Sequence, residues 1–148
     1  MSYSTAQRRT EEETTTKMKL VTRHFGELEF DESIVYHFPN GLFGFEELHD
    51  FIIIDDKDTE PLRWLLSVED PTVGFAVVDA THLAPELYGE LAADERNSSS
   101  MFVVLVLRRD PEPITANLKA PIVLNNGNKF GKQLVLNSDK YLTDYKIN

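Results

Sequence analysis

The chain has 148 residues, a length typical of one domain whose core needs no disulfide or metal. It contains no cysteine, which excludes disulfides, thiolate zinc sites and cysteine nucleophiles. Its net charge is −10: residues 40–96 hold 14 acidic and 3 basic residues (net −11), and residues 97–148 hold 4 acidic and 7 basic (net +3). This acidic middle argues against direct nucleic-acid binding and favours a basic protein partner, although solubility alone explains it equally well.

The first 17 residues are rich in Ser, Thr, Glu and Arg and offer almost nothing to bury. This composition predicts a disordered polar tail at residues 1–17, followed by a single β-barrel domain at residues 18–148. The tail lacks the apolar stretch of a signal peptide, and the apolar run Met101–Leu107 is too short to span a bilayer. We therefore expect a cytoplasmic protein that does not contact a membrane.

The first half of the chain predicts strands separated by turns. The runs KLVTRHF (19–25) and GELEF (26–30) predict half-buried strands, the second because its apolar residues alternate with acids. SIVYHF (33–38) stops at the turn residues Pro39, Asn40 and Gly41. DFIIIDD (50–56) is continuously apolar at its centre, which predicts burial on both faces. RWLLSV (63–68) and VGFAVVD (73–79) predict two strands joined by a turn.

The second half adds one helix and further strands. The segment APELYGELAADE (84–95) is the single predicted helix, with Pro85 in its first turn and Leu87 and Leu91 on one face. MFVVLVLRR (101–109), PIVLN (121–125) and KQLVLN (132–137) predict strands, and Asn126-Gly127 predicts a hairpin because both residues tolerate positive φ. Together these elements predict an all-β fold: a single small β-barrel of short, mostly antiparallel strands with one short helix.

Catalytic and metal-binding patterns are missing from the sequence. His24, His37, His49 and His82 are scattered, without the spacing of metal ligands. The acidic run DDKD (55–58) lacks the glycine and the distal glutamate of a calcium loop. Ser67 has no nucleophile elbow around it. We therefore expect no metal, no cofactor and no enzymatic activity.

The sole tryptophan, Trp64, lies in a predicted strand, where it shares one face with Leu66 while Ser67 lies on the other. A tryptophan in a strand is usually a core residue, so we expect Trp64 and Phe75 to pack mainly in the core. Tryptophan is also enriched at interface hot spots, and Trp64 therefore remains a candidate partner contact.

Two polar segments also have a structural and a functional interpretation. In the turn after Ser67, Asp70 is expected to bond nearby backbone amides, while Glu69 and Asp70 are candidate acidic contacts for a partner. Asn117 is expected to satisfy backbone groups where a strand leaves the barrel, or its segment offers an edge to which another strand could add.

Three stretches together resemble the FliW family of bacterial flagellar assembly factors: FPNGLFGFEELHDF (38–51), WLLSVEDPTVGFAV (64–77) and TANLKAPIVLNNGNKFGKQLVL (115–136). They occur in the order of the family's motifs. The residues that match the family pattern are Phe38, Pro39, Gly41, Leu42, Gly44, Phe45, Glu46, Trp64, Leu65, Ser67, Asp70, Pro71, Thr115, Ala116, Asn117, Leu118, Ala120, Pro121, Gly131 and Gln133. Leu66 departs from the pattern, since the family more often has glutamine there.

The resemblance implies a cytoplasmic, non-catalytic β-barrel that binds two partners in alternation. These are flagellin and CsrA, a small basic RNA-binding translational regulator. A family member bound to CsrA antagonises it allosterically, away from its RNA-contacting surface, and so relieves repression of flagellin translation. Accumulated flagellin occupies the factor and frees CsrA. We expect a monomer when the protein is free.

The candidate partner contacts are Phe45, Glu46, Trp64, Ser67, Glu69, Asp70 and Asn117. The alternative function is a small-ligand-binding β-barrel of unrelated role, which requires a deep apolar pocket with convergent polar groups.

Overall fold

The computed structural model describes residues 7–8, 16–109 and 111–147. The strands are β1 (Gln7–Arg8), β2 (Thr16–Thr22), β3 (Gly26–Asp31), β4 (Tyr36–His37), β5 (Asp50–Asp55), β6 (Arg63–Ser67), β7 (Gly74–Asp79), β8 (Ser99–Val106), β9 (Thr115–Asn125), β10 (Gly131–Gln133) and β11 (Tyr145–Lys146). The helical segments are α1 (Ala93–Ser98) and the short 3-10 helices η1 (Glu32–Ile34), η2 (Lys57–Thr59), η3 (Ala80–His82) and η4 (Pro85–Glu90).

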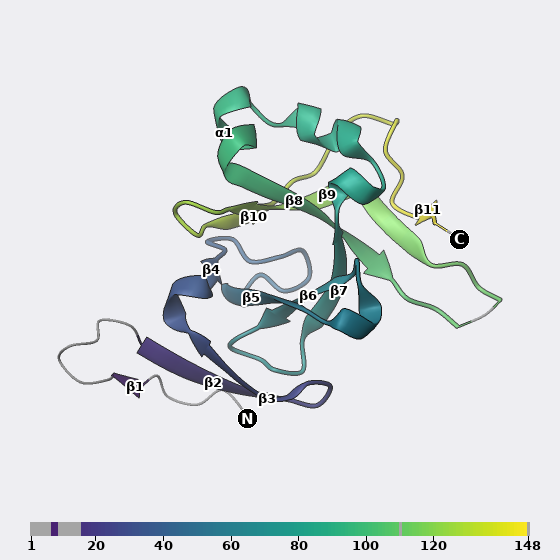
Figure 1. Ribbon diagram of the computed structural model, residues 1–148. Helices are drawn as coiled ribbons and strands as arrows, with labels where there is room; N and C mark the ends of the chain where they lie inside the picture. The colour runs from purple at the N-terminus through teal and green to yellow at the C-terminus, as the bar shows by residue number, and fades with distance from the viewer. Residues whose placement is uncertain (1–6, 9–15, 110, 148) are drawn as a thin grey trace.

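The main sheet is antiparallel and has the order β10-β9-β8-β7-β6-β5-β4, with β11 paired to the beginning of β9 (Figure 1). Its two ends meet where the backbone N–H of His37 donates to the carbonyl oxygen of Lys129 at 2.8 Å. His37 also forms a parallel bridge with Phe130. The sheet is therefore nearly closed, which confirms the predicted all-β, barrel-like fold of mostly antiparallel strands.

The interior of this sheet is filled by large apolar side chains that alternate along the strands. Its buried members are Tyr36, Phe38, Leu42, Phe51, Leu65, Val77, Phe102, Ile122 and Leu124. Burial of each such side chain stabilises the fold by about 1.5–3 kcal/mol relative to exposure. The barrel interior is consequently a packed core.

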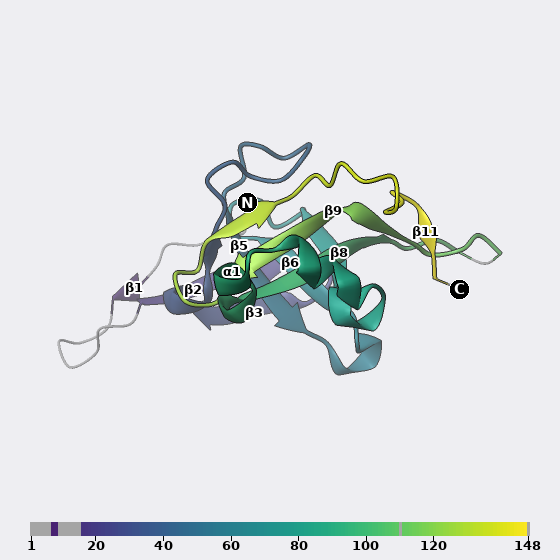
Figure 2. The same ribbon diagram turned by 90° about the horizontal axis from the view of Figure 1, so that it is seen from above.

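The outer faces of the sheet are covered by two other layers (Figures 1 and 2). Below β5 and β6, the β2–β3 hairpin forms a second apolar cluster with buried residues Met18, Leu20, Phe30, Ile52, Leu66 and Val68. Above β8 and β9, the helical segments and the chain after β10 form a third cluster, in which Leu87, Leu91, Leu136 and Tyr141 are buried. The face assignment of β6 is confirmed, because Leu66 lies outside the barrel and Leu65 inside it.

Tyr88 fastens the helical layer to the sheet. Its hydroxyl donates to Asp79 Oδ1 at 3.0 Å and accepts from the backbone N–H of Met101 at 2.8 Å. Burial raises the pKa of Tyr88 above the usual 10.0, and the nearby negative charge of Asp79 acts in the same direction.

The helix predicted over residues 84–95 is wrong in its extent, because the chain forms η4 and α1 instead. Leu91 and Ala92 between them are extended. The guanidinium of Arg96 folds back and donates to the carbonyl oxygens of Tyr88 at 3.1 Å and Leu91 at 2.9 Å. A side chain thus satisfies carbonyls that a continuous helix would have bonded internally.

Several strand predictions also need correction. KLVTRHF (19–25) is a strand only as far as Thr22, and residues 23–25 form the turn between β2 and β3. The first part of SIVYHF is helix η1, because Asp31 accepts a capping bond from the backbone N–H of Ser33. In β5, the predicted burial on both faces is confirmed, because Phe51 is buried in the barrel interior and Ile52 in the outer cluster, while Ile53 and Ile54 are half-buried. The run KQLVLN contributes only residues 132–133 to β10, although Leu134 still donates to the carbonyl of Pro121 at 2.9 Å.

The hairpin after β9 is present, but its positive φ angle is not at Asn126 or Gly127. It is at Lys129, with φ of 62°. The side-chain oxygen of Asn125 accepts from the backbone N–H groups of Gly127 (2.9 Å) and Asn128 (3.0 Å), and this local bonding sets the turn.

The predicted disordered tail falls mostly on residues 1–6 and 9–15, which lie outside the described residues. Of its remaining residues, Gln7–Arg8 form β1, which pairs with Thr16 and Lys17 at the start of β2.

Candidate functional site

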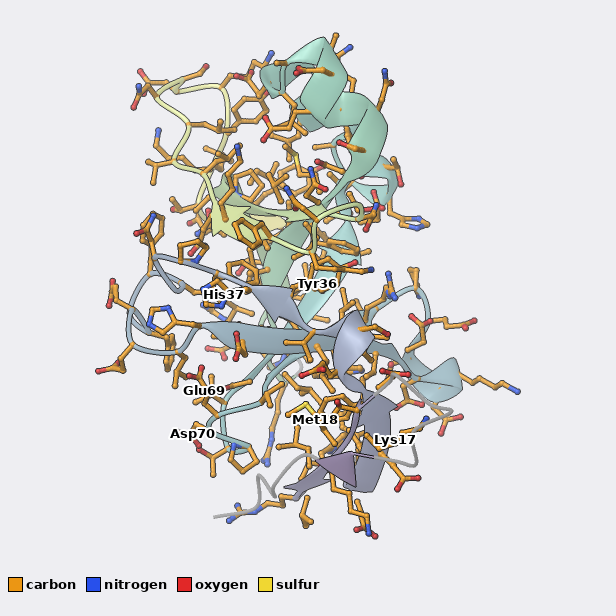
Figure 3. The ribbon with its side chains drawn as sticks, turned by 90° about the vertical axis from the view of Figure 1, so that its left-hand side faces the viewer. Lys17, Met18, Tyr36, His37, Glu69 and Asp70 are labelled. Atoms are coloured by element: carbon orange, nitrogen blue, oxygen red, sulfur yellow. The ribbon has the colours of Figure 1, made fainter. Side chains whose placement is uncertain are left out.

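The loop of residues 38–49 and the β6–β7 turn meet at one end of the molecule. The carboxylate of Glu69 joins them, because its Oε1 accepts from the backbone N–H of His49 at 2.5 Å and of Asp50 at 3.1 Å. Figure 3 shows Glu69 and Asp70 together on this turn, with Tyr36 and His37 on β4, on the far side of β5. We call Glu46, Glu47, Asp50, Glu69 and Asp70 the acidic end.

The turn is preorganised by its own side chains. Ser67 is fully buried, and its hydroxyl oxygen accepts from the backbone N–H of Glu69 (3.2 Å) and Asp70 (2.9 Å). Asp70 Oδ1 accepts from Thr72 Oγ1 at 2.6 Å and from the backbone N–H of Thr72 at 3.1 Å. The hydroxyl bond, and then the amide bond, hold the pKa of Asp70 below its usual range. The predicted bonding of Asp70 to a backbone amide is confirmed, and Ser67 is a structural residue.

The loop owes its shape to glycine and to local hydrogen bonds. Gly41 has a φ of 65°, and a Cβ there would lie 2.6 Å from the carbonyl oxygen of Phe45. Phe45 is half-buried and packs edge-on against Phe75, with 5.4 Å between ring centroids. Glu46 is exposed, and its carboxylate accepts from the backbone N–H of Gly44 at 3.1 Å. Phe45 is therefore partly accessible to a partner, and Glu46 is exposed to solvent.

His37 and His49, which are 12 residues apart in the sequence, lie together beside the acidic end. The rings of His37 and His49 stack with 5.9 Å between centroids. His37 Nδ1 lies 2.8 Å from Asp50 Oδ1, and His49 Nδ1 lies 2.8 Å from the carbonyl oxygen of Phe38. The antiparallel pairing of β4 with β5, in which His37 lies opposite Asp50, brings the two rings together. The sequence predicts both strands but not this register. Within the described part of the chain, no group of three or more His, Cys, Asp or Glu residues is arranged to hold a metal ion.

Trp64 belongs to a different surface. Its ring is half-buried and packs against the two outer apolar clusters, and its Nε1 donates to Thr59 Oγ1 at 3.1 Å. It also lines an open groove of about 590 Å³ between the β2–β3 turn and the β6–β7 turn. Trp64 is thus both a packing residue and a surface residue, and Phe75 is likewise half-buried.

Asn117 has the structural role that one interpretation predicts. Its Oδ1 accepts from the backbone N–H of Lys119 (3.1 Å) and Ala120 (3.2 Å). It pairs with Val104 at the irregularity in the β8–β9 register. The side chain therefore stabilises a bulge in the sheet, where extra backbone groups need partners.

A second groove, of about 460 Å³, lies where the sheet closes. Phe43 and Phe130 line it and are 53% and 52% exposed. Gln133 spans it, because its Oε1 accepts from the backbone N–H of Phe43 at 2.9 Å and its Nε2 donates to the carbonyl of Ala120 at 3.1 Å. Gly131 lies directly against the Phe38 ring. Neither groove is an enclosed pocket of the kind that the small-ligand alternative requires.

These features define a small, nearly closed antiparallel β-barrel protein whose candidate surfaces are loops and open grooves around a packed interior. Among the residues described, no helix is long and apolar enough to cross a bilayer.

The chain matches the family model of the FliW protein over residues 19–147. It is 40% identical over 139 residues to the flagellar assembly factor FliW of Caldanaerobacter subterraneus subsp. tengcongensis, covering 88% of this chain and 93% of that protein. The corresponding protein of Thermoanaerobacter pseudethanolicus is 35% identical, with the same coverage. A crystal structure of the flagellar assembly factor FliW superposes with a TM-score of 0.74 at 29% identity, covering 86% of this chain and 95% of the other. The chain therefore belongs to the FliW family of flagellar assembly factors.

Proposed function

We propose that this protein binds flagellin and CsrA in alternation, antagonises CsrA allosterically, and so relieves repression of flagellin translation. The observation that carries the proposal is family membership over residues 19–147. The proposal describes a cytoplasmic, non-enzymatic protein that is monomeric when free, needs no cofactor and does not itself bind nucleic acid. Its action consists entirely of choosing between two protein partners.

The acidic end supports the choice of a basic partner. Its carboxylates belong to the segment of residues 40–96, whose net charge is −11. The bonds from Glu69 to His49 and Asp50 hold the loop and the turn in one arrangement. A fixed cluster of negative charge accelerates encounter with a basic protein such as CsrA and disfavours acidic competitors.

The predicted contacts differ in what they can offer to a partner. Ser67 is buried, and Asn117 and Glu69 are engaged in backbone hydrogen bonds. Glu46 is exposed, and its neighbour Glu47 is exposed without a polar contact in the described structure. We therefore propose that CsrA contacts the acidic end chiefly through exposed carboxylates of the loop, with the β6–β7 turn as their support.

The experiment compares Glu47→Lys with the matched control Glu86→Lys, which alters another exposed glutamate, on η4. We expect Glu47→Lys to slow association with CsrA several-fold at low ionic strength, in a stopped-flow or surface-capture assay. The difference should shrink as salt is added, because ions screen exposed charges beyond about 10 Å at 0.1 M. Equal effects of the two variants would contradict the placement of CsrA at the acidic end. Absence of CsrA binding by the unaltered protein would contradict the function itself.

A further inference from the structure

The groove beside Trp64 has the size and composition of a recognition site. Its volume of about 590 Å³ falls within the range of ligand-binding clefts. The end of β2 and the β2–β3 turn line the groove with Val21, Arg23, His24 and Phe25. The rest of the lining comes from Trp64 of β6 and from residues in and beside the β6–β7 turn.

The apolar part of the groove is aromatic and open to solvent. The Trp64 ring lies 5.9 Å from that of Phe25 and 5.8 Å from that of His24, measured between centroids. Val21, near the end of β2, is 49% exposed because it lies on the outward face of the strand, opposite the buried Leu20 and Thr22. Trp64, Phe25 and Val21 therefore give the groove an apolar surface on which an apolar side chain can pack.

The charge of the groove is opposite to that of the protein. Arg23 is the lining side chain that carries a permanent charge, and within the described structure it makes no ion pair and no side-chain hydrogen bond. No acidic residue is among the described residues that line the groove, and Asp70 in the β6–β7 turn accepts its hydrogen bonds from Thr72. In a chain of net charge −10, Arg23 therefore leaves a cationic point beside an aromatic surface.

We propose that this groove docks a peptide segment of a protein partner in which an apolar or aromatic side chain is adjacent to a carboxylate. The apolar side chain packs on Trp64 and Phe25, and the carboxylate pairs with Arg23, whose guanidinium suits bidentate recognition of carboxylates. This charge preference is the reverse of that at the acidic end, so the two surfaces select partners of opposite charge. The inference goes beyond the proposed function and does not depend on CsrA or flagellin binding.

The chain provides its own reporter, because Trp64 is its only tryptophan. Selective excitation of Trp64 in the full chain is followed while a synthetic peptide, acetyl-Glu-Phe-Glu-Leu-amide, is added. The matched probe is the same peptide with lysine in place of both glutamates. We expect a saturable change in Trp64 emission with the acidic peptide, weakened by salt, and no saturable change with the lysine peptide.

Two variants and two controls make the test specific. Arg23→Glu and Val21→Asp alter exposed residues at the rim, and each should weaken acidic-peptide binding about tenfold, because attraction is replaced by repulsion. Arg108→Glu and Val135→Asp make the same changes at exposed positions away from the groove and should leave binding unchanged. Urea denaturation confirms that the variants fold. The proposal is overturned if the lysine peptide binds equally well, if no saturable change occurs, or if Arg23→Glu and Arg108→Glu behave alike.

Discussion

Glu69 holds the loop of residues 38–49 against the β6–β7 turn. The loss of stability when Glu69 is replaced should measure how much this contact contributes. Its Oε1 accepts two backbone hydrogen bonds, from His49 at 2.5 Å and from Asp50 at 3.1 Å. A hydrogen bond contributes about 0.5–1.5 kcal/mol net, and at this exposed site we take the lower part of that range, about 0.5–1 kcal/mol for each of the two bonds. We therefore expect Glu69→Ala to lower the free energy of unfolding by about 1–2 kcal/mol. For a chain of this size, the midpoint of thermal unfolding should fall by about 3–6 °C.

The assay is urea denaturation followed by circular dichroism, with Glu47→Ala as the matched control. Glu47 lies in the same loop and is exposed, so its removal should change stability by less than about 0.5 kcal/mol. Glu69→Gln keeps a neutral oxygen acceptor, and its loss of unfolding free energy should be about half that of Glu69→Ala. If Glu69→Ala proves as stable as Glu47→Ala, then Glu69 does not hold the loop. If the loss is found, reduced partner binding by a Glu69 variant cannot be assigned to a lost contact alone.

Three further predictions concern residues that shape the barrel and the turn. A Cβ at Gly131 would lie 2.3 Å from Phe38 Cζ. Gly131→Ala should therefore lower the free energy of unfolding, measured by urea denaturation, by about 1–3 kcal/mol. The double variant Gly131→Ala, Phe38→Leu should recover part of this stability. An unchanged urea midpoint for Gly131→Ala would refute this packing. Asn117→Ala should lower the free energy of unfolding by about 1–2 kcal/mol, whereas Asn117→Asp, which keeps the side-chain oxygen acceptor, should lower it less. Equal losses of stability in the two variants would contradict the role of Asn117 as a hydrogen-bond acceptor. Since bonding to Thr72 lowers the pKa of folded Asp70 from the usual 3.8, its contribution to stability is present above that pH and lost as pH falls through the lower folded value. Thr72→Val should raise the Asp70 pKa in an NMR titration, and an unmoved titration would show that the hydroxyl is not the cause.

Local patterns in the sequence predict most of the sheet. Alternation in GELEF and RWLLSV specifies strands and the faces of their side chains, and Leu65 and Leu66 accordingly lie on opposite sides of β6. The Ser67–Thr72 turn is likewise predictable, because its hydrogen bonds join residues two or three positions apart.

Features that depend on tertiary contacts are not predictable in this way. Arg96 divides the expected helix by donating to carbonyls five and eight residues earlier, which neither helical periodicity nor capping rules include. The hydrogen bonds that Glu69 accepts from His49 and Asp50 cross 20 and 19 residues, and the stacking of His37 on His49 depends on the register of β4 against β5. A position in the sequence therefore identifies Glu69 as exposed and acidic, but not as a residue that fixes a loop.

The central claim, alternation between two partners, is tested most directly by displacement. A complex of this protein with CsrA is assembled and isolated by size-exclusion chromatography, and flagellin from the same organism is then added in increasing amounts. The account predicts that CsrA elutes free in proportion to the flagellin added while this protein co-elutes with flagellin. A ternary complex of all three proteins, or a CsrA complex that excess flagellin leaves intact, would contradict it.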